Sequence, residues 1–212
     1  MGLQADAIDR ILSGVRVMPV VLIEKTAHAA PLARALMDGG IKGIEVTLRT
    51  PVALEAVKTI LAEVPGMTVG TGTVLSPNDF DASAEAGAAF AVSPGLTDEL
   101  ARSAASLFSQ MPLLPGTATA SEVMKALDHG FERLKLFPAE AVGGLNLIKS
   151  LASPLPRAKF CPTGGITEKT APDYLAQANT FCVGGSWLTP KALMEEGDWG
   201  EITRRAKIAA VL

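Results

Sequence analysis

The chain has 212 residues, enough for one domain with a substantial hydrophobic core. Its composition, 48% hydrophobic and 19% charged, is that of a globular protein and excludes a disordered chain. The net charge of −3 gives no indication of a nucleic-acid or membrane-surface partner, so an anionic ligand would have to be attracted by local charge.

The N-terminal segment does not read as a targeting signal. Asp6, Asp9 and Arg10 interrupt its apolar residues, and no run in the chain approaches the roughly 20 apolar residues of a membrane span. Cys161 and Cys182 lie inside apolar segments and form no CxxC pair, which predicts two buried free thiols in a reducing compartment. We therefore expect a soluble, cytoplasmic protein.

Short apolar runs alternate with helix-period segments along the whole chain, after a short N-terminal helix predicted over Gln4–Ser13. The eight predicted strands are Val15–Ile23, Gly43–Arg49, Thr68–Val74, Phe90–Gly95, Met111–Gly116, Arg133–Pro138, Lys159–Gly165 and Phe181–Trp187. The predicted helical stretches between them include His28–Asp38, Val52–Glu63, Ser83–Ala86, Asp98–Phe108 and Ala120–His129. Ser76-Pro77 marks the start of one helix, and Gly39-Gly40 and Gly130 mark the ends of others.

The repeat of about 25 residues is typical of βα units around a parallel sheet. Eight such units close into a (β/α)₈ barrel, the TIM barrel, and this is the predicted fold. An open doubly wound sheet is the main structural alternative. No linker, low-complexity stretch or charge block divides the chain, so we expect a single domain over residues 1–212.

Polar residues gather at the carboxyl ends of the predicted strands, where such barrels carry their active sites. Glu45, Thr47 and Arg49 share one face of the second strand, and the apolar residues between them share the other. The apolar face suits the surrounding helices, which leaves the charged face pointing inward. Lys135 alternates with two leucines on the sixth strand in the same way. An inward lysine and glutamate are costly unless they are paired or used in chemistry.

Lys135 has two interpretations. One is a buried structural ion pair with Glu45. The other is an amine nucleophile that condenses with a ketone. The remaining lysines fall on predicted helices or loops, or at the opposite end of a strand, where a solvated charge is the ordinary outcome.

Glycine-rich segments end the last two predicted strands. They are Thr163-Gly164-Gly165 and Gly184-Gly185-Ser186. Loops after strands seven and eight are the usual phosphate site of a barrel, because backbone N–H groups and a helix N-terminus converge there. The two segments together predict a phosphate site.

A metal centre is not expected. His28 and His129 are the only histidines, and both fall in predicted helices, where a surface position is the ordinary outcome. They leave no metal-ligand set, and we predict no cofactor.

Several segments resemble the 2-keto-3-deoxy-6-phosphogluconate aldolase family. Gly40–Arg49 (GIKGIEVTLR) is similar to that family's active-site signature, and Lys135–Glu140 (KLFPAE), between Gly130 and Gly143, resembles its Schiff-base segment. Further similar strand ends are Val69–Val74, Ser93–Gly95, Cys161–Ile166 and Gly184–Trp187. The resemblance runs from about Pro19 to Trp187, and no motif places Arg16.

The resemblance implies a class I aldolase that cleaves 2-keto-3-deoxy-6-phosphogluconate to pyruvate and glyceraldehyde 3-phosphate in the Entner–Doudoroff pathway. It also implies a homotrimer and some activity on 4-hydroxy-2-oxoglutarate. It assigns the Schiff base to Lys135 and proton transfer to Glu45. It assigns pyruvate contacts to Arg49, Thr73 and Thr163. The implied phosphate contacts are Gly164, Gly165, Gly184, Gly185 and Ser186.

Two alternatives stay open at this point. A similar aldolase for the galactonate epimer would share every residue argued above. A non-catalytic barrel that binds a sugar phosphate is less consistent with Lys135 and Glu45 both facing inward.

Overall fold

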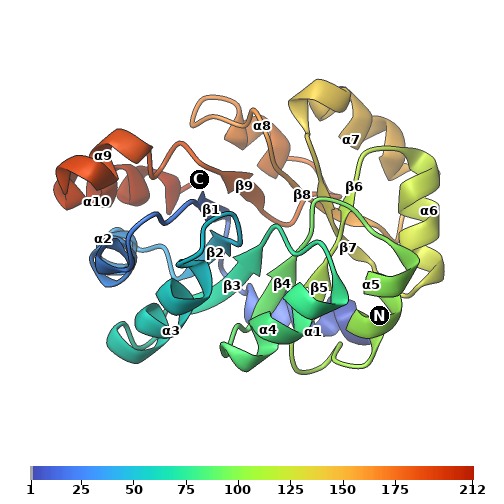
Figure 1. Cartoon of the computed structure of the whole chain (residues 1–212). Coiled ribbons are helices and arrows are strands. Elements are labelled where there is room, and N and C mark those ends of the chain that lie inside the picture. Colours follow the sequence, from blue (N-terminus) through green and yellow to red (C-terminus); the bar gives the residue numbers. More distant parts are fainter. Residues whose placement is uncertain (1) are drawn as a thin grey trace.

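A computed structural model describes residues 2–212, so Met1, which belongs to the predicted single domain and to the N-terminal segment, lies outside the described residues. The described chain forms parallel strands surrounded by helices (Figure 1). The strands are β1 (Val17–Val21), β2 (Gly43–Thr47), β3 (Thr68–Gly72), β4 (Phe90–Val92), β5 (Leu113–Leu114), β6 (Gly116–Thr117), β7 (Arg133–Leu136), β8 (Lys159–Pro162) and β9 (Val183–Gly185). The α/β class with a parallel sheet is confirmed.

The strands form two parallel sheets, in the orders β5-β4-β3-β2-β1-β9 and β6-β7-β8. The boundary between the sheets falls at Pro115, which divides the predicted strand Met111–Gly116 into β5 and β6. Proline has no N–H to give to a neighbouring strand, so the pairing is interrupted there. β5 pairs with β4, whereas the Pro115 carbonyl accepts from the Lys135 N–H of β7. The predicted single strand Met111–Gly116 is therefore wrong: two short strands, β5 and β6, take its place in different sheets.

The second boundary between the sheets lies between β8 and β9. Isolated parallel bridges pair Phe160 with Thr180 and Thr163 with Gly184 across this boundary. The bridges bring the carboxyl ends of the last two strands together.

The helices lie around the outside of the strands, except the first helix, which precedes β1 and packs against both sheets (Figure 1). They are α1 (Leu3–Ile11), α2 (Ala29–Asp38), α3 (Ala53–Glu63), α4 (Pro77–Glu85), α5 (Asp98–Ala105), α6 (Ala120–Asp128), α7 (Gly144–Ala152), α8 (Ala171–Leu175), α9 (Lys191–Glu196) and α10 (Trp199–Ala209), with 3₁₀ turns η1 (Thr26–His28) and η2 (Glu140–Val142). The helices α7 to α10 lie outside the predicted set.

The predicted helix start at Ser76-Pro77 is confirmed. The Ser76 hydroxyl accepts from the Asp79 N–H while the Asp79 carboxylate accepts from the Ser76 N–H, a capping box in front of α4. The predicted stretch Ser83–Ala86 is therefore only the end of a helix that begins at Pro77.

The short N-terminal helix is also present, as α1, which ends two residues earlier than predicted. Gln4 on this helix is fully buried. Its Nε2 donates to the carbonyls of Leu113 and Arg133, each at 2.9 Å, and its Oε1 accepts from the N–H groups of Glu132 and Arg133. One side chain thus ties α1 to β5 and β7, which belong to different sheets.

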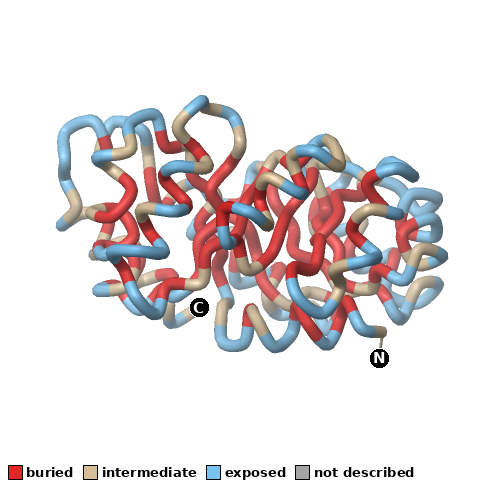
Figure 2. Tube along the Cα trace, turned by 60° about the horizontal axis from the view of Figure 1, so that its bottom comes forward, coloured by how far each residue is buried: buried red, intermediate tan, exposed pale blue. Residues whose placement is uncertain are grey.

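Buried residues lie in the middle of the molecule, and exposed residues lie on the outer helices and loops (Figure 2). The larger hydrophobic cluster packs the strands against the helices. A smaller one joins side chains from α1 and both sheets: Ile8, Leu12, Met18, Phe90, Val92, Leu114, Cys161 and Cys182. Both cysteines are buried and free, as predicted. Burial raises the pKa of the Cys182 thiol well above its ordinary value, so this thiol stays protonated.

Candidate active site

Five of the predicted site residues line one cavity of about 90 Å³. They are Glu45, Arg49, Thr73, Lys135 and Thr163, from β2 and β7 or from positions just beyond the ends of β2, β3 and β8. The cavity therefore lies at the carboxyl ends of the strands, where a parallel α/β protein presents its reactive groups.

Lys135 and Glu45 form the centre of this cavity. The Lys135 Nζ lies 3.2 Å from Glu45 Oε1, and the two side chains are only 7% and 3% exposed. The Nζ also lies 5.3 Å from the centre of the Phe137 ring. Because both charged groups line a cavity and are not enclosed in the hydrophobic core, the amine is placed to meet a ligand. This position favours the nucleophile over the purely structural ion pair.

Thr47 connects β2 to the Arg49 side chain. The Thr47 hydroxyl donates to the Val21 carbonyl at 2.8 Å and accepts from Arg49 Nε at 3.3 Å. Among residues 2–212, the guanidinium makes no other hydrogen bond with a protein group. Its two terminal nitrogens are therefore free to fork onto an anion such as a carboxylate.

Thr73 has an unusual backbone. Its φ of 60° places a non-glycine residue in the left-handed region, directly after β3. Such a conformation costs on the order of 1–3 kcal/mol and concentrates at binding sites. A Thr held this way at the cavity wall is consistent with a binding role.

Thr163 also lines the cavity, directly after β8. Its N–H donates to the Leu136 carbonyl at 2.9 Å, and its hydroxyl donates to the Cys161 carbonyl at 3.3 Å. The first bond fixes the threonine against β7, the strand that carries Lys135, and the second connects its hydroxyl to β8.

Four other residues line the cavity but were not among the predicted site residues. They are Val20, Thr47, Pro94 and Phe137. For Thr47, the alternation along β2 already indicates an inward side chain. Phe137 and Pro94 belong to the segments KLFPAE and SPG, so their presence in the motifs is the signal that could have identified them.

The predicted phosphate residues lie beside this cavity without lining it. The Thr163–Gly184 bridge places the loops after β8 and β9 next to one another, as the prediction requires. Gly164 and Gly165 have φ values of +100° and +83°, which only glycine adopts readily. Ser186 is exposed at the end of β9.

Gly184 and Gly185 have packing reasons to be glycine. A Cβ at Gly184 would lie 2.2 Å from the Thr163 hydroxyl oxygen. A Cβ at Gly185 would lie 1.8 Å from the Trp187 ring. Close packing of these two side chains thus requires both glycines, in addition to any part they take in anion binding.

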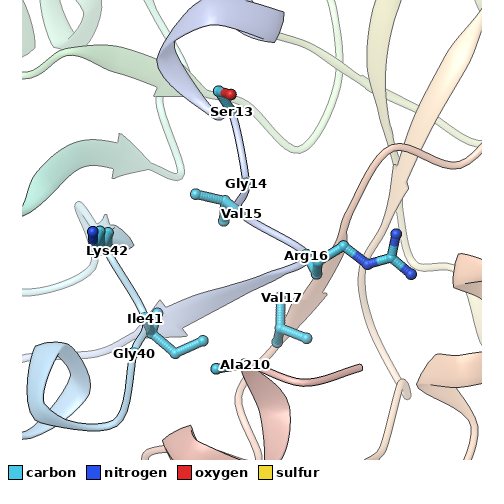
Figure 3. Close-up of a pocket in the computed structure, with 9 residues that line it drawn as sticks. All are labelled: Ser13, Gly14, Val15, Arg16, Val17, Gly40, Ile41, Lys42 and Ala210. Carbon is cyan, nitrogen blue, oxygen red and sulfur yellow. The ribbon is translucent and has the colours of Figure 1, made fainter.

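A second cavity, of about 290 Å³, lies at the amino ends of β1 and β2 (Figure 3). Its charged side chains are Arg16, which the motifs left unplaced, and Lys42. One guanidinium nitrogen of Arg16 donates to the main-chain oxygen of Leu212 at 3.0 Å. This cavity has no acid–base pair comparable to Lys135 and Glu45, so it is not the candidate active site.

The histidines lie outside both cavities and at helix boundaries. His28 belongs to η1, just before α2, with its ring 5.7 Å from that of Trp199, and His129 follows α6 beside Asp98. Within residues 2–212, no three His, Cys, Asp or Glu residues are grouped to hold a metal ion. None of the helices in this range is long and apolar enough to cross a membrane.

Comparison with known proteins gives consistent matches. Residues 8–205 match the family model of KDPG and KHG aldolase. The 2-dehydro-3-deoxy-phosphogluconate aldolase of Pseudomonas aeruginosa is 46% identical over 202 residues, 95% of this chain and 91% of that protein. The 2-keto-3-deoxy-6-phosphogluconate aldolase of Zymomonas mobilis ZM4, solved with 3-phosphoglycerate, is 50% identical with a TM-score of 0.89, over 96% of this chain and 94% of that one.

A third relative has been solved with a reaction intermediate. The KDPG aldolase of Legionella pneumophila, with pyruvate captured at low pH as a covalent carbinolamine intermediate, superposes with a TM-score of 0.90 at 40% identity. The match covers 98% of this chain and 97% of that chain.

Proposed function

The chain belongs to the KDPG and KHG aldolase family, and on that premise we propose that it cleaves 2-keto-3-deoxy-6-phosphogluconate to pyruvate and glyceraldehyde 3-phosphate. The observation that carries the proposal is the Lys135 amine, 3.2 Å from the Glu45 carboxylate at the wall of a cavity. The enzyme is a carbon–carbon lyase, specifically a class I aldolase, which works through a Schiff base. We also propose a side activity on 4-hydroxy-2-oxoglutarate.

The reaction begins with an imine. Glu45 takes a proton from the Lys135 ammonium, and the neutral Nζ adds to the C2 ketone to form a carbinolamine. Loss of water, with a proton returned by Glu45 to the departing hydroxyl, leaves a protonated imine. The 3.2 Å separation allows this proton transfer without a large movement of either side chain.

The imine then serves as the electron sink. When Glu45 removes the C4 hydroxyl proton through a water, the C3–C4 bond breaks and its electron pair moves to the imine nitrogen as an enamine. Glyceraldehyde 3-phosphate leaves as the aldehyde. Protonation of the enamine at C3 gives the pyruvate imine, and hydrolysis of that imine releases pyruvate and restores Lys135.

The remaining site residues hold the two ends of the substrate. Arg49 binds the carboxylate with its terminal nitrogens, and the Thr73 hydroxyl donates beside it. Thr163, whose hydroxyl already donates to the Cys161 carbonyl, contacts the substrate from the cavity wall. The phosphate binds at the loops after β8 and β9. The backbone groups and hydroxyl proposed for it are those of Gly164, Gly165, Gly184, Gly185 and Ser186.

The test is a borohydride trap combined with turnover. Pyruvate and borohydride should inactivate the protein and leave a reduced adduct on the peptide that contains Lys135. Lys135→Arg should abolish turnover, because a guanidinium does not act as the nucleophile, whereas Lys125→Arg, on the exposed face of α6, should not. An adduct on another residue, or retained turnover in Lys135→Arg, would refute the proposal.

Two further measurements define the activity. Initial rates on the gluconate and galactonate epimers, side by side, establish the preference at C4, and we expect the gluconate epimer to be favoured. Dialysis against EDTA should leave turnover intact, because no proposed step requires a metal ion. Loss of activity restored by a divalent ion would favour a metal-dependent aldolase.

For the whole molecule we propose a single closed (β/α)₈ barrel over residues 1–212. The chain passes directly from β5 through Pro115 to β6, and the Thr163–Gly184 bridge joins β8 to β9, which supports closure at both sheet boundaries. We also propose a homotrimer in the cytoplasm. Light scattering should give three times the mass of one chain, and a monomer would refute the assembly.

A further inference from the structure

A short hydrogen bond lies behind the loop that follows β8. The Tyr174 hydroxyl on α8 donates to Glu140 Oε1 at 2.5 Å. Tyr174 is 2% exposed, and Glu140 is the first residue of η2, shortly after the strand that carries Lys135. The bond connects the segment after β7 to α8, the helix after β8. Gly164 and Gly165 belong to the loop between β8 and α8, so both Glu140 and Tyr174 flank that loop.

Glu140 also contacts that loop directly. Its N–H donates to the Gly164 carbonyl at 3.1 Å. A Cβ at Gly165 would lie 2.6 Å from Glu140 Cγ, so the glycine backbone packs against the glutamate side chain. Gly164 and Gly165 both have positive φ. Glycine adopts many other backbone conformations as readily, so these two residues do not fix the shape of the loop by themselves. The loop is therefore held in one conformation through its contacts with Glu140.

The surroundings of the pair keep the Tyr174 phenol protonated. Burial raises the pKa of the Tyr174 phenol, and the hydrogen bond and charge of Glu140 raise it further, so the phenol remains a donor. Glu140 Oε2 lies beside Gly144, the first residue of α7.

We propose that Glu140 and Tyr174 are positioning residues for the substrate phosphate, acting through the Gly164–Gly165 loop. An anion site built from backbone N–H groups binds well only when the backbone is held in place before the anion arrives. The inference rests on the proposed function, because it takes this loop as the phosphate site. It adds two residues that do not touch the substrate but determine the affinity for its phosphate.

The experiment compares Tyr174→Phe with the parent on the phosphorylated keto acid and on 4-hydroxy-2-oxoglutarate, which has no phosphate. Losing a hydrogen bond to a charged group should raise KM for the phosphorylated substrate by about tenfold. KM and kcat on 4-hydroxy-2-oxoglutarate should change by less than about twofold. Gln177→Ala, which removes the exposed bond from Gln177 to the Asp173 carbonyl near the end of α8, is the matched control and should leave both KM values unchanged.

A conservative variant separates positioning from folding. Glu140→Gln keeps a hydrogen-bond acceptor and the packing against Gly165, so its KM should stay within about twofold of the parent. Glu140→Ala removes both contacts and should reproduce the Tyr174→Phe defect. Equal losses of Tyr174→Phe on the two substrates, or no loss on either, would overturn the inference.

Titration with inorganic phosphate distinguishes this inference from the proposed function. The Kd for phosphate should rise by about tenfold in Tyr174→Phe and remain near the parent value in Glu140→Gln. A parent protein that fails to cleave the keto acid would refute the proposed function. The phosphate titration would still test whether Glu140 and Tyr174 position the phosphate loop. An unchanged phosphate Kd in Tyr174→Phe would overturn the inference.

Discussion

The carboxylate of Glu45 occupies the space that a side chain at Gly72 would fill. A Cβ at Gly72 would lie 2.2 Å from Glu45 Oε1 and 2.7 Å from its Cγ. Gly72 ends β3 and pairs with Thr47 on β2, so it lies next to the strand that carries the glutamate. The glutamate reaches Lys135 across this bare stretch of backbone.

Gly72→Ala should therefore displace the Glu45 carboxylate and lower kcat by at least about tenfold, since the proton transfer needs its present position. The extra methyl should also destabilise the fold by about 1–3 kcal/mol through overpacking. Steady-state kinetics and thermal unfolding measure the two effects. Gly95→Ala is the matched control, because a Cβ there meets nothing within 4 Å. A Gly72→Ala enzyme as active as its Gly95→Ala counterpart would contradict the argument.

Glu45→Gln should slow cleavage by about 10²–10⁴-fold, the range expected when an acid–base group is lost. The amide keeps the size of the side chain and an acceptor for Lys135 Nζ, so the imine site stays intact. Exchange of the pyruvate methyl protons with deuterated water should slow in parallel, and proton NMR follows it. Glu63→Gln, on the exposed end of α3, is the control. If both rates stay within about threefold of the parent, Glu45 is not the proton shuttle.

Ser186→Asp should place a negative charge in the proposed phosphate loop and repel the phosphate. We expect a rise of at least about tenfold in KM for the phosphorylated keto acid and a change under about twofold for 4-hydroxy-2-oxoglutarate. Ser186→Asn is the neutral control of similar size. A Gly185→Val variant would be a poor test, because its side chain would collide with the Trp187 ring. Equal KM values for the aspartate and asparagine variants would place the phosphate elsewhere.

Acid should abolish one stabilising contact on α10. Hydrogen bonds from Arg204 and then Arg205 lower the pKa of the Glu201 carboxyl from its ordinary 4.5 to about 2. Because the pKa of Glu201 is lower in the folded chain than in the unfolded chain, its ionised carboxylate stabilises the fold at pH values above 4.5. This stabilisation is lost as the pH falls toward about 2, where the carboxylate becomes protonated in the folded chain too. Glu201→Gln should therefore lower Tm at pH 7, and the difference from the parent should shrink steadily below pH 4.5. Added salt should shrink it as well. A difference that persists at pH 2 would show another cause.

The local pattern of the sequence determined which side chains point inward. Side chains alternate along any strand with period two, so Glu45 and Thr47 share a face wherever β2 lies. The predicted strand runs on to Arg49, but β2 ends at Thr47, so the alternation does not extend to Arg49. The same local rule predicted the inward Lys135, and Ser76-Pro77 marked the beginning of α4 because capping involves only neighbouring residues. These features depend on residues within a few positions of one another.

Only the tertiary structure decided which of these groups meet. Lys135 and Glu45 are 90 positions apart, and their 3.2 Å contact depends on the order and spacing of the strands between them. Glu140 meets Tyr174 across 34 positions, and no local pattern signals that bond. Likewise, the bare backbone at Gly72 has a purpose only when Glu45 lies over it. Distances between strands result from the packing of the whole chain, so a periodic pattern along one strand cannot predict them.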